Sequence, residues 1–190
     1  MRDDLFVRGE VPMTKMEVRG TIVGYLSLKP GQNVLEIGAG TGSCTVQMLK
    51  SCPDIQLTAV ERSFSACKLI EENLSKHGVK ARIVQGEAPD LELLSLEQWD
   101  AVFIGGSGSR LESIMKWLED GRLKPGATLV FSAITLESIQ EIFTYVNGRY
   151  NSIEGSQLCV SRLEALGKYH YFKPLNPCTV IKCIYGGENV

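Results

Sequence analysis

Three glycines spaced two residues apart follow a short apolar run and have the pattern of a ligand-binding turn. Residues 34–42 read Val-Leu-Glu-Ile-Gly-Ala-Gly-Thr-Gly. Glycine is favoured where the backbone adopts unusual angles or a ligand must approach without a Cβ in the way. A strand that leads through such a turn into a helix presents backbone N–H groups and the positive end of a helix dipole. The pattern therefore predicts a site for a polar or anionic small molecule.

Glu61 is predicted to be the second part of this site. It ends the next strand-like run, 19 positions after Gly42. A carboxylate there can accept hydrogen bonds from both hydroxyls of a ribose. The Gly-x-Gly-x-x-Gly fingerprint of NAD-binding turns is not matched, because its third glycine would fall on Ser43 or Thr45. The pattern favours an adenosine-containing ligand other than NAD, although it does not exclude NAD.

The elements that must position these residues alternate between strand and helix. Thr14 and Glu17 match a capping box at the start of the first helix, and Ser63 or Ser65 can cap a later one. Apolar residues recur at helical spacing between short, continuous apolar runs that mark strands. The predicted strands are 34–37, 56–61, 81–85, 99–104 and 127–132, and the helices after the first are 43–51, a stretch ending at 77, 110–119 and 136–146.

This alternation predicts an α/β fold with a doubly wound, mostly parallel sheet. Two later strand-like runs, 152–162 and 179–185, predict an antiparallel hairpin at one edge, joined by a basic and aromatic loop at 167–173. Ligands bind such sheets beyond the carboxyl ends of the strands. That rule places four segments on one rim: 38–42, 61, 86–88 and 105–109.

The composition predicts one ordinary domain. The chain has 190 residues, 44% of them hydrophobic and 22% charged, with a net charge of −2. We expect a single domain over 1–190, with a flexible, loosely packed arm at 1–12. The sequence has no basic excess, no signal-peptide pattern and no long apolar run, so it predicts a cytoplasmic protein that binds neither nucleic acid nor membranes. Six scattered cysteines without a Cys-x-x-Cys pair favour neither a disulfide framework nor a metal site.

The motifs together resemble those of class I S-adenosylmethionine-dependent methyltransferases. The glycine turn matches the first motif, Glu61 the ribose-binding position, and Gly86-Glu-Ala-Pro the turn beside the adenine. The resemblance implies a Rossmann-like, seven-stranded sheet with a C-terminal antiparallel hairpin, and S-adenosylmethionine as methyl donor. It implies cofactor contacts from Glu36, Gly38, Ala39, Gly40, Thr41, Gly42, Glu61, Glu87 and Ala88.

A narrower resemblance rests on Pro12-x-Thr-Lys-x-Glu-Val-Arg19 together with Gly105-Gly-Ser-Gly108. With the earlier motifs, these stretches are similar to the decarboxylating precorrin or cobalt-precorrin C15-methyltransferases of corrin biosynthesis. That family implies methylation at C15 of a (cobalt-)precorrin-6B and loss of carbon dioxide from its C12 acetate. It also implies that Thr14 contacts the cofactor, and that the chain forms a homo-oligomer, with a tetramer among the candidate states.

A precorrin carries many carboxylates, so its site is expected to be basic or rich in backbone N–H groups. The substrate-rim candidates are Gly105, Gly106, Ser107, Gly108, Arg110, Lys15 and Arg19, with Lys168, His170 and Lys173 on the late loop. No catalytic residue is assigned, and His170 and Tyr171 are the candidates for proton transfer. Three alternatives stay open: another small class I methyltransferase acting on RNA or protein, a non-catalytic binding module of the same fold, and an NAD-dependent oxidoreductase.

Overall fold

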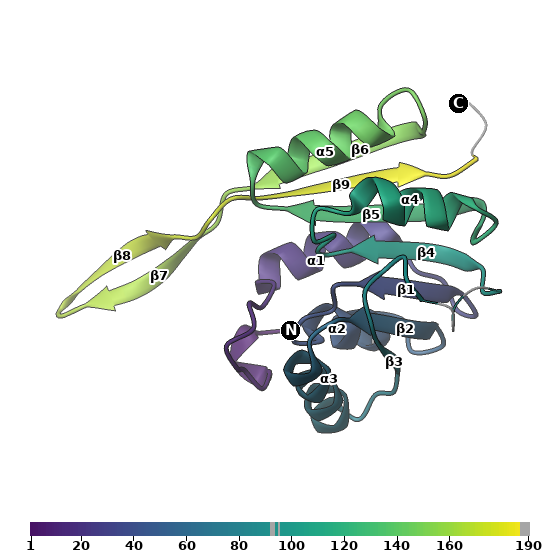
Figure 1. Ribbon diagram of the computed structural model, residues 1–190. Coiled ribbons are helices and arrows are strands. Elements are labelled where there is room, and N and C mark those ends of the chain that lie inside the picture. The colour runs from purple at the N-terminus through teal and green to yellow at the C-terminus, as the bar shows by residue number, and fades with distance from the viewer. Residues whose placement is uncertain (92–93, 95, 187–190) are drawn as a thin grey trace.

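The computed structural model describes residues 1–91, 94 and 96–186, and a seven-stranded sheet lies at its centre (Figure 1). The strand order is β3-β2-β1-β4-β5-β9-β6, and neighbours among the first five are parallel. β9 is antiparallel to both β5 and β6, which confirms the expected antiparallel pair at one edge. The strands are β1 (Asn33–Ile37), β2 (Gln56–Glu61), β3 (Arg82–Gln85), β4 (Trp99–Ile104), β5 (Leu123–Ala133), β6 (Asn151–Leu158) and β9 (Cys178–Ile184).

Helices cover both faces of the sheet, so the body has three layers (Figure 1). Successive strand residues point to opposite faces, and Val34 accordingly packs in one core while Leu35 packs in the other. A short 3₁₀-helix, η1 (Asp3–Leu5), precedes the first α-helix. On one face lie α1 (Met16–Leu26), α2 (Ser43–Ser51) and α3 (Phe64–His77), and on the other α4 (Leu111–Glu119) and α5 (Leu136–Val146).

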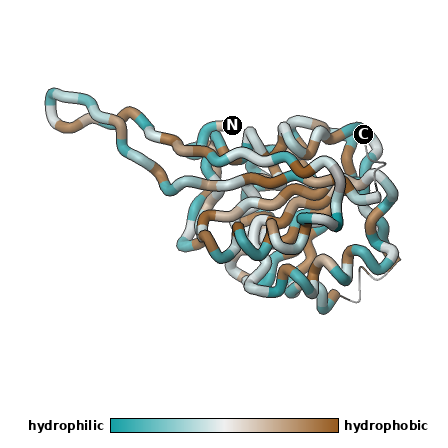
Figure 2. The backbone as a smooth tube through the Cα atoms, turned by 90° about the horizontal axis from the view of Figure 1, so that it is seen from above, coloured by the Kyte–Doolittle hydropathy of each residue, from teal (hydrophilic) through white to brown (hydrophobic). Residues whose placement is uncertain are grey.

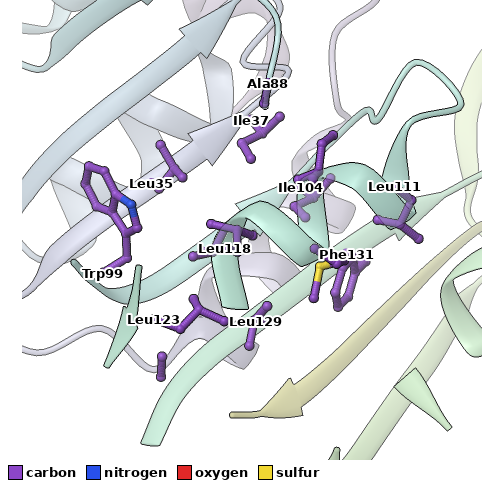
Figure 3. Packing of buried hydrophobic residues seen from close by; sticks show 14 of the residues in the cluster. Leu35, Ile37, Ala88, Trp99, Ile104, Leu111, Leu118, Leu123, Leu129 and Phe131 are labelled. Atoms are coloured by element: carbon purple, nitrogen blue, oxygen red, sulfur yellow. The ribbon is translucent and has the colours of Figure 1, made fainter. Parts of the chain in front are cut away.

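Apolar side chains fill the space between the sheet and α4, as Figure 3 shows. Leu111 and Leu118 of the helix meet Ile104 and Phe131 of the strands, and all four side chains are buried. The central strands are buried on both faces, which explains their continuous apolar runs. Burial of each large side chain contributes about 1.5–3 kcal/mol. The core therefore holds the carboxyl ends of the strands, where ligands bind, in fixed positions.

A two-stranded arm projects from this body (Figures 1 and 2). It consists of β7 (Ser161–Leu166) and β8 (Tyr169–Pro174), which pair antiparallel around a turn at Gly167 with φ +60°. The expectation of a loop at 167–173 was therefore wrong. The aromatic residues of β8 suit a strand, and the glycine permits the tight turn.

The first helix begins differently from the sequence prediction. Lys15, not Thr14, is the N-cap residue of α1, and no side chain caps this helix. The Thr14 carbonyl accepts a hydrogen bond from Arg19, and the Glu17 carboxylate is bound by Arg162 of the arm. A distant partner thus overrides the local capping pattern. Cap formation by Ser63 is confirmed, because its hydroxyl accepts from an N–H of the first turn of α3.

The start of the chain and the start of β5 also depart from expectation. The side chains of Asp3 and Phe6 are buried, so residues 1–12 are not loosely packed at these positions. Strand β5 begins at Leu123, four residues before the predicted start at 127, and Leu123 pairs with Trp99. Among the described residues, every helix is too short or too polar to cross a bilayer.

Candidate active site

A cavity of about 780 Å³ opens at the carboxyl ends of the parallel strands. Its wall is completed by residues 11–15 from the N-terminal segment, which run alongside the glycine turn. The cavity brings together most of the predicted site. Its lining includes the cofactor candidates Thr14, Glu36, Gly38, Ala39, Gly40, Thr41, Glu61, Glu87 and Ala88, and the substrate candidates Lys15, Gly105, Gly106, Ser107 and Gly108.

The glycine turn owes its composition to positive φ angles and to close packing. Gly38, Gly40 and Gly42 have φ values of +76°, +57° and +73°, in the region that side chains rarely adopt. Gly42 does not line the cavity, and a Cβ on it would lie 3.1 Å from Ile70 of α3. Its expected contact with the cofactor stays a prediction, and this glycine permits α2 and α3 to approach each other.

Glu61 holds the turn in place from the end of β2. One of its carboxylate oxygens accepts from the N–H of Gly40 and the other from the N–H of Ser63, each at 2.9 Å. Each oxygen keeps a second lone pair, so the carboxylate can still accept from a ligand. The contact that organises the turn thus places an acceptor at the edge of the cavity.

Glu36 lies below the turn and is 1% exposed. Burial raises the pKa of its carboxyl to about 8, and the charge of Glu61 acts in the same direction. The hydroxyl of Thr45 opposes this shift by donating to Glu36 Oε2 at 2.5 Å. At neutral pH the Glu36 carboxyl is therefore largely protonated, and it can both donate and accept hydrogen bonds.

The structure removes Arg19 from the substrate rim. Its guanidinium is fully buried and pairs with Asp3 at 2.8 Å. Sequence position alone suggested an exposed helix face, whereas Arg19 points into the N-terminal segment. Among the described residues that line the cavity, Lys15 keeps an ammonium group with no ion-pair partner.

Arg110 lies outside the cavity lining and is tied to two carboxylates. It contacts Asp90 at 2.7 Å and Glu87 at 3.7 Å. Glu87 is also approached by Arg62 at 3.4 Å. The helix α4 begins only at Leu111, so Arg110 is its N-cap residue. Both Arg110 and Glu87 thus have protein partners that the sequence pattern did not reveal.

The late basic and aromatic residues are not brought to the cavity either. Lys168, His170 and Tyr171 lie on the arm, and Lys173 pairs with Glu164 across it. The expectation that they share the rim was wrong, because residues 167–173 form part of a projecting hairpin. His170 and Tyr171 do not line this cavity, so the structure does not support them as its proton-transfer groups.

Sequence reasoning missed the apolar half of the cavity. Ile134, which follows β5 and is 65% exposed, lies on its wall with Pro174 and Leu175 at the base of the arm. Ile134 could have been found, because it stands at the carboxyl end of a parallel strand. Residues 174–176 could not, since only the path of the arm brings them back to the sheet.

The part of the cavity lined by the glycine turn and Glu61, here called the donor half, suits a nucleoside ligand. The Thr41 hydroxyl is buried without a hydrogen-bond partner among the described residues. The Glu61 carboxylate lines the same cavity, and glycines leave room for close approach of a ligand. An unsatisfied hydroxyl and a spare acceptor in one cavity are what a polyhydroxylated ligand such as a ribose would complete.

Comparison with known proteins shows the family to which this chain belongs. The model of the precorrin methyltransferase domain family matches residues 4–184. The chain belongs to this family. The cobalt-precorrin-6B C(15)-methyltransferase (decarboxylating) of Salmonella typhi is 39% identical over 186 residues, which cover 96% of this chain and 95% of the relative.

Solved structures of family members have the same fold. A precorrin-6y C5,15-methyltransferase from Geobacter metallireducens superimposes with a TM-score of 0.89 at 29% identity and covers 97% of this chain and 96% of its own. A precorrin 8w decarboxylase from Methanobacterium thermoautotrophicum gives 0.88 at 28% identity, covering 96% and 98%. The precorrin methyltransferase fold therefore extends over nearly the whole chain, which confirms the predicted α/β class I methyltransferase architecture.

Proposed function

We propose that this chain transfers a methyl group from S-adenosylmethionine to C15 of cobalt-precorrin-6B and releases the C12 acetate carboxyl as carbon dioxide, in cobalamin biosynthesis. Near full-length similarity to the Salmonella typhi methyltransferase supports this activity. The observation that carries it is a single cavity in which a polar, glycine-lined half adjoins an apolar half. Donor and acceptor would meet where the two halves join.

The donor half would hold S-adenosylmethionine through the glycine turn and Glu61. Thr41 and Thr14 would line the same half, with Ala88 beside the adenine. The donor supplies an activated methyl on a sulfonium. The chain's own task is to align that methyl with the acceptor carbon and to exclude water. The predicted cofactor contacts remain predictions at the level of single residues.

The acceptor half would take the tetrapyrrole against Ile134, Pro174 and Leu175. Lys15 is the cation best placed to receive a propionate or acetate carboxylate. When the C12 acetate loses carbon dioxide, the electron pair of the broken C–C bond passes into the conjugated ring. Such a step needs a bound carboxylate and a delocalised anion rather than a strong base. The backbone N–H groups of residues 105–108 and the apolar side chain of Ile134 agree with this need.

We also infer self-association through the arm. Its strands leave their edges unpaired, and exposed apolar side chains cover it: Leu163, Leu166, Tyr169, Tyr171 and Phe172. An isolated two-stranded ribbon is marginally stable in water, and unpaired edges invite further strands. A second copy of this chain would cover both the unpaired strand edges and the exposed apolar side chains. A tetramer, a single domain over 1–190 and a cytoplasmic location are the remaining parts of this proposal.

Incubation with cobalt-precorrin-6B and methyl-labelled S-adenosylmethionine tests the activity directly. Mass spectrometry should find a product with one added labelled methyl and one carbon dioxide fewer. Transfer RNA and an isoaspartyl peptide, offered under the same conditions, should stay unlabelled. Labelling of either of these instead of the tetrapyrrole would refute the proposal, and donor binding with no methylated product would leave a binding module.

A further inference from the structure

A cluster of four charged side chains, two buried and two partly exposed, joins the arm to the N-terminal wall of the cavity. Asp3 Oδ1 accepts from Arg19 at 2.8 Å, and Asp3 Oδ2 lies 2.7 Å from Arg162. Arg162 also donates two hydrogen bonds to the Glu17 carboxylate, at 3.1 and 2.6 Å. The cluster contains two positive and two negative groups, so its charges balance. It links three segments of the chain: η1, α1 and β7.

Arg19 carries this linkage to the cavity. Its guanidinium donates to the carbonyl of Thr14 and, at 2.7 Å, to the carbonyl of Met1, and it lies 4.6 Å above the ring of Phe6. Thr14 and Lys15 line the cavity directly. Because Arg19 is fully buried, its position depends on the carboxylate that neutralises it. Asp3 therefore fixes the guanidinium that fixes the backbone of the wall.

A second set of contacts holds the N-terminal segment, at Val7, against the glycine turn. Asn73 of α3 accepts from the Val7 N–H and donates to the Val7 carbonyl, at 2.7 and 3.1 Å. It also donates to the carbonyl of Thr41 at 2.9 Å. All three hydrogen bonds of the Asn73 amide are made with backbone groups, so this side chain positions the backbone. The N-terminal segment that leads into the wall is thus tied to the turn at Val7 and to the arm at Asp3.

We propose that Arg162 is a positioning residue for the donor half of the cavity, acting through Asp3 and Arg19 on the backbone of Thr14. This inference rests on the proposed function only in naming the donor as S-adenosylmethionine. Arg162 is suited to a test by substitution because its side chain is 33% exposed, whereas the side chain of Arg19 is fully buried. Its loss leaves Asp3 and Arg19 still paired with each other, whereas loss of Asp3 would strand a buried cation.

The test compares Arg162→Met with Lys173→Met. Both substitutions remove one positive charge from the arm, but the ion-pair partner of Lys173 among the described residues is the exposed Glu164. Binding of S-adenosylmethionine is measured by calorimetry and amide exchange over residues 8–18 by mass spectrometry, both without tetrapyrrole. We expect Arg162→Met to weaken donor binding about 2- to 30-fold and to speed exchange in that segment. Lys173→Met should change neither.

The outcomes separate a positioning role from a general one. With both substitutions, turnover at saturating donor should stay within about twofold, so the change appears in KM for the donor and not in kcat. Arg162→Lys keeps the charge but loses the paired contacts with Glu17, so it should give an intermediate donor affinity. If Arg162→Met fails to fold, Arg162→Lys takes its place in the comparison. Unchanged donor affinity and exchange would overturn the inference, as would equal losses in the Lys173 control. Failure of tetrapyrrole turnover alone would bear on the proposed function and not on this measurement.

Discussion

Gly38 and Gly106 lie backbone against backbone at the floor of the cavity. A Cβ added to Gly38 would stand 2.9 Å from the Gly106 carbonyl oxygen and 3.0 Å from its nitrogen. The two glycines follow neighbouring parallel strands, in which Ile37 is level with Ile104. The donor turn and the run after β4 are therefore one packed unit, although 67 positions separate Gly38 from Gly105.

Replacing Gly38 with alanine should destabilise the protein and abolish donor binding. The new Cβ would clash with a backbone that cannot move aside, and φ +76° is strained for alanine. We expect a loss of about 1–3 kcal/mol in the free energy of unfolding, measured by urea denaturation. Gly106→Ala is the control, because nothing lies within 4 Å of its added Cβ. Equal stability of the two variants would contradict the packing argument.

Glu61→Ala should weaken S-adenosylmethionine binding by about 1.5–3 kcal/mol, the usual effect of losing a charge-assisted hydrogen bond. It should also loosen the turn, because the N–H groups of Gly40 and Ser63 lose their acceptor. Calorimetry gives the affinity and thermal melting the stability. Glu72→Ala, an exposed position on α3, serves as control. Unaltered affinity in the Glu61 variant would exclude its ribose role.

Glu36 should make the protein less stable as the pH rises. Its pKa is about 8 in the folded protein and about 4.3 in an unfolded chain. Between these values the folded state binds more protons than the unfolded state, so the free energy of unfolding falls with rising pH. The contribution is fully present below pH ~4.3 and is lost as the pH passes ~8, with a slope of up to about 1.4 kcal/mol per pH unit.

Glu36→Gln isolates this effect, since glutamine has the same shape and can still accept from Thr45. Urea denaturation of both proteins at several pH values from 5 to 9 gives the difference curve. The variant should gain stability relative to the parent towards pH 9. Parallel curves would mean that Glu36 does not titrate in this range.

Lys15→Ala should impair tetrapyrrole turnover while donor affinity stays the same. Lys15 lines the cavity without an ion-pair partner among the described residues, and an ammonium group there can bind a substrate carboxylate. We expect KM for the tetrapyrrole to rise by a factor that corresponds to about 1.5–3 kcal/mol of binding free energy. Steady-state kinetics measures this change. Lys116→Ala, on the exposed side of α4 and paired with Glu112, is the control. A parallel loss of donor affinity would point to a structural role for Lys15.

Substitution of Phe172 by aspartate should reduce self-association. Phe172 is 69% exposed on β8 and faces Leu163 across the ribbon, so a charge there would have to be buried in any interface that covers the arm. Light scattering of the parent and the variant measures the oligomeric state. Phe64→Asp, at an equally exposed phenylalanine far from the arm on α3, should leave it unchanged. A parent protein that is itself monomeric would contradict the proposed self-association through the arm.

Local sequence was sufficient for most of the body and for the donor half of the site. Continuous apolar runs mark strands buried on both faces, and the glycine spacing with Glu61 depends on backbone angles and strand ends that neighbours along the chain determine. The strands 56–61 and 99–104 and the helix 43–51 were predicted with their observed bounds. The predicted class of ligand rests on the same local pattern.

Only the tertiary structure decided the roles of the charged residues and the shape of the acceptor half. Arg19 and Arg110 look like free cations in sequence, yet each finds carboxylates brought near by distant segments. The ribbon at 161–174 exists because two short runs pair with each other, and its base becomes a cavity wall only through the place of β9 between β5 and β6. Ion pairs and chain paths of this kind join residues far apart in sequence, and local propensity holds no record of such partners.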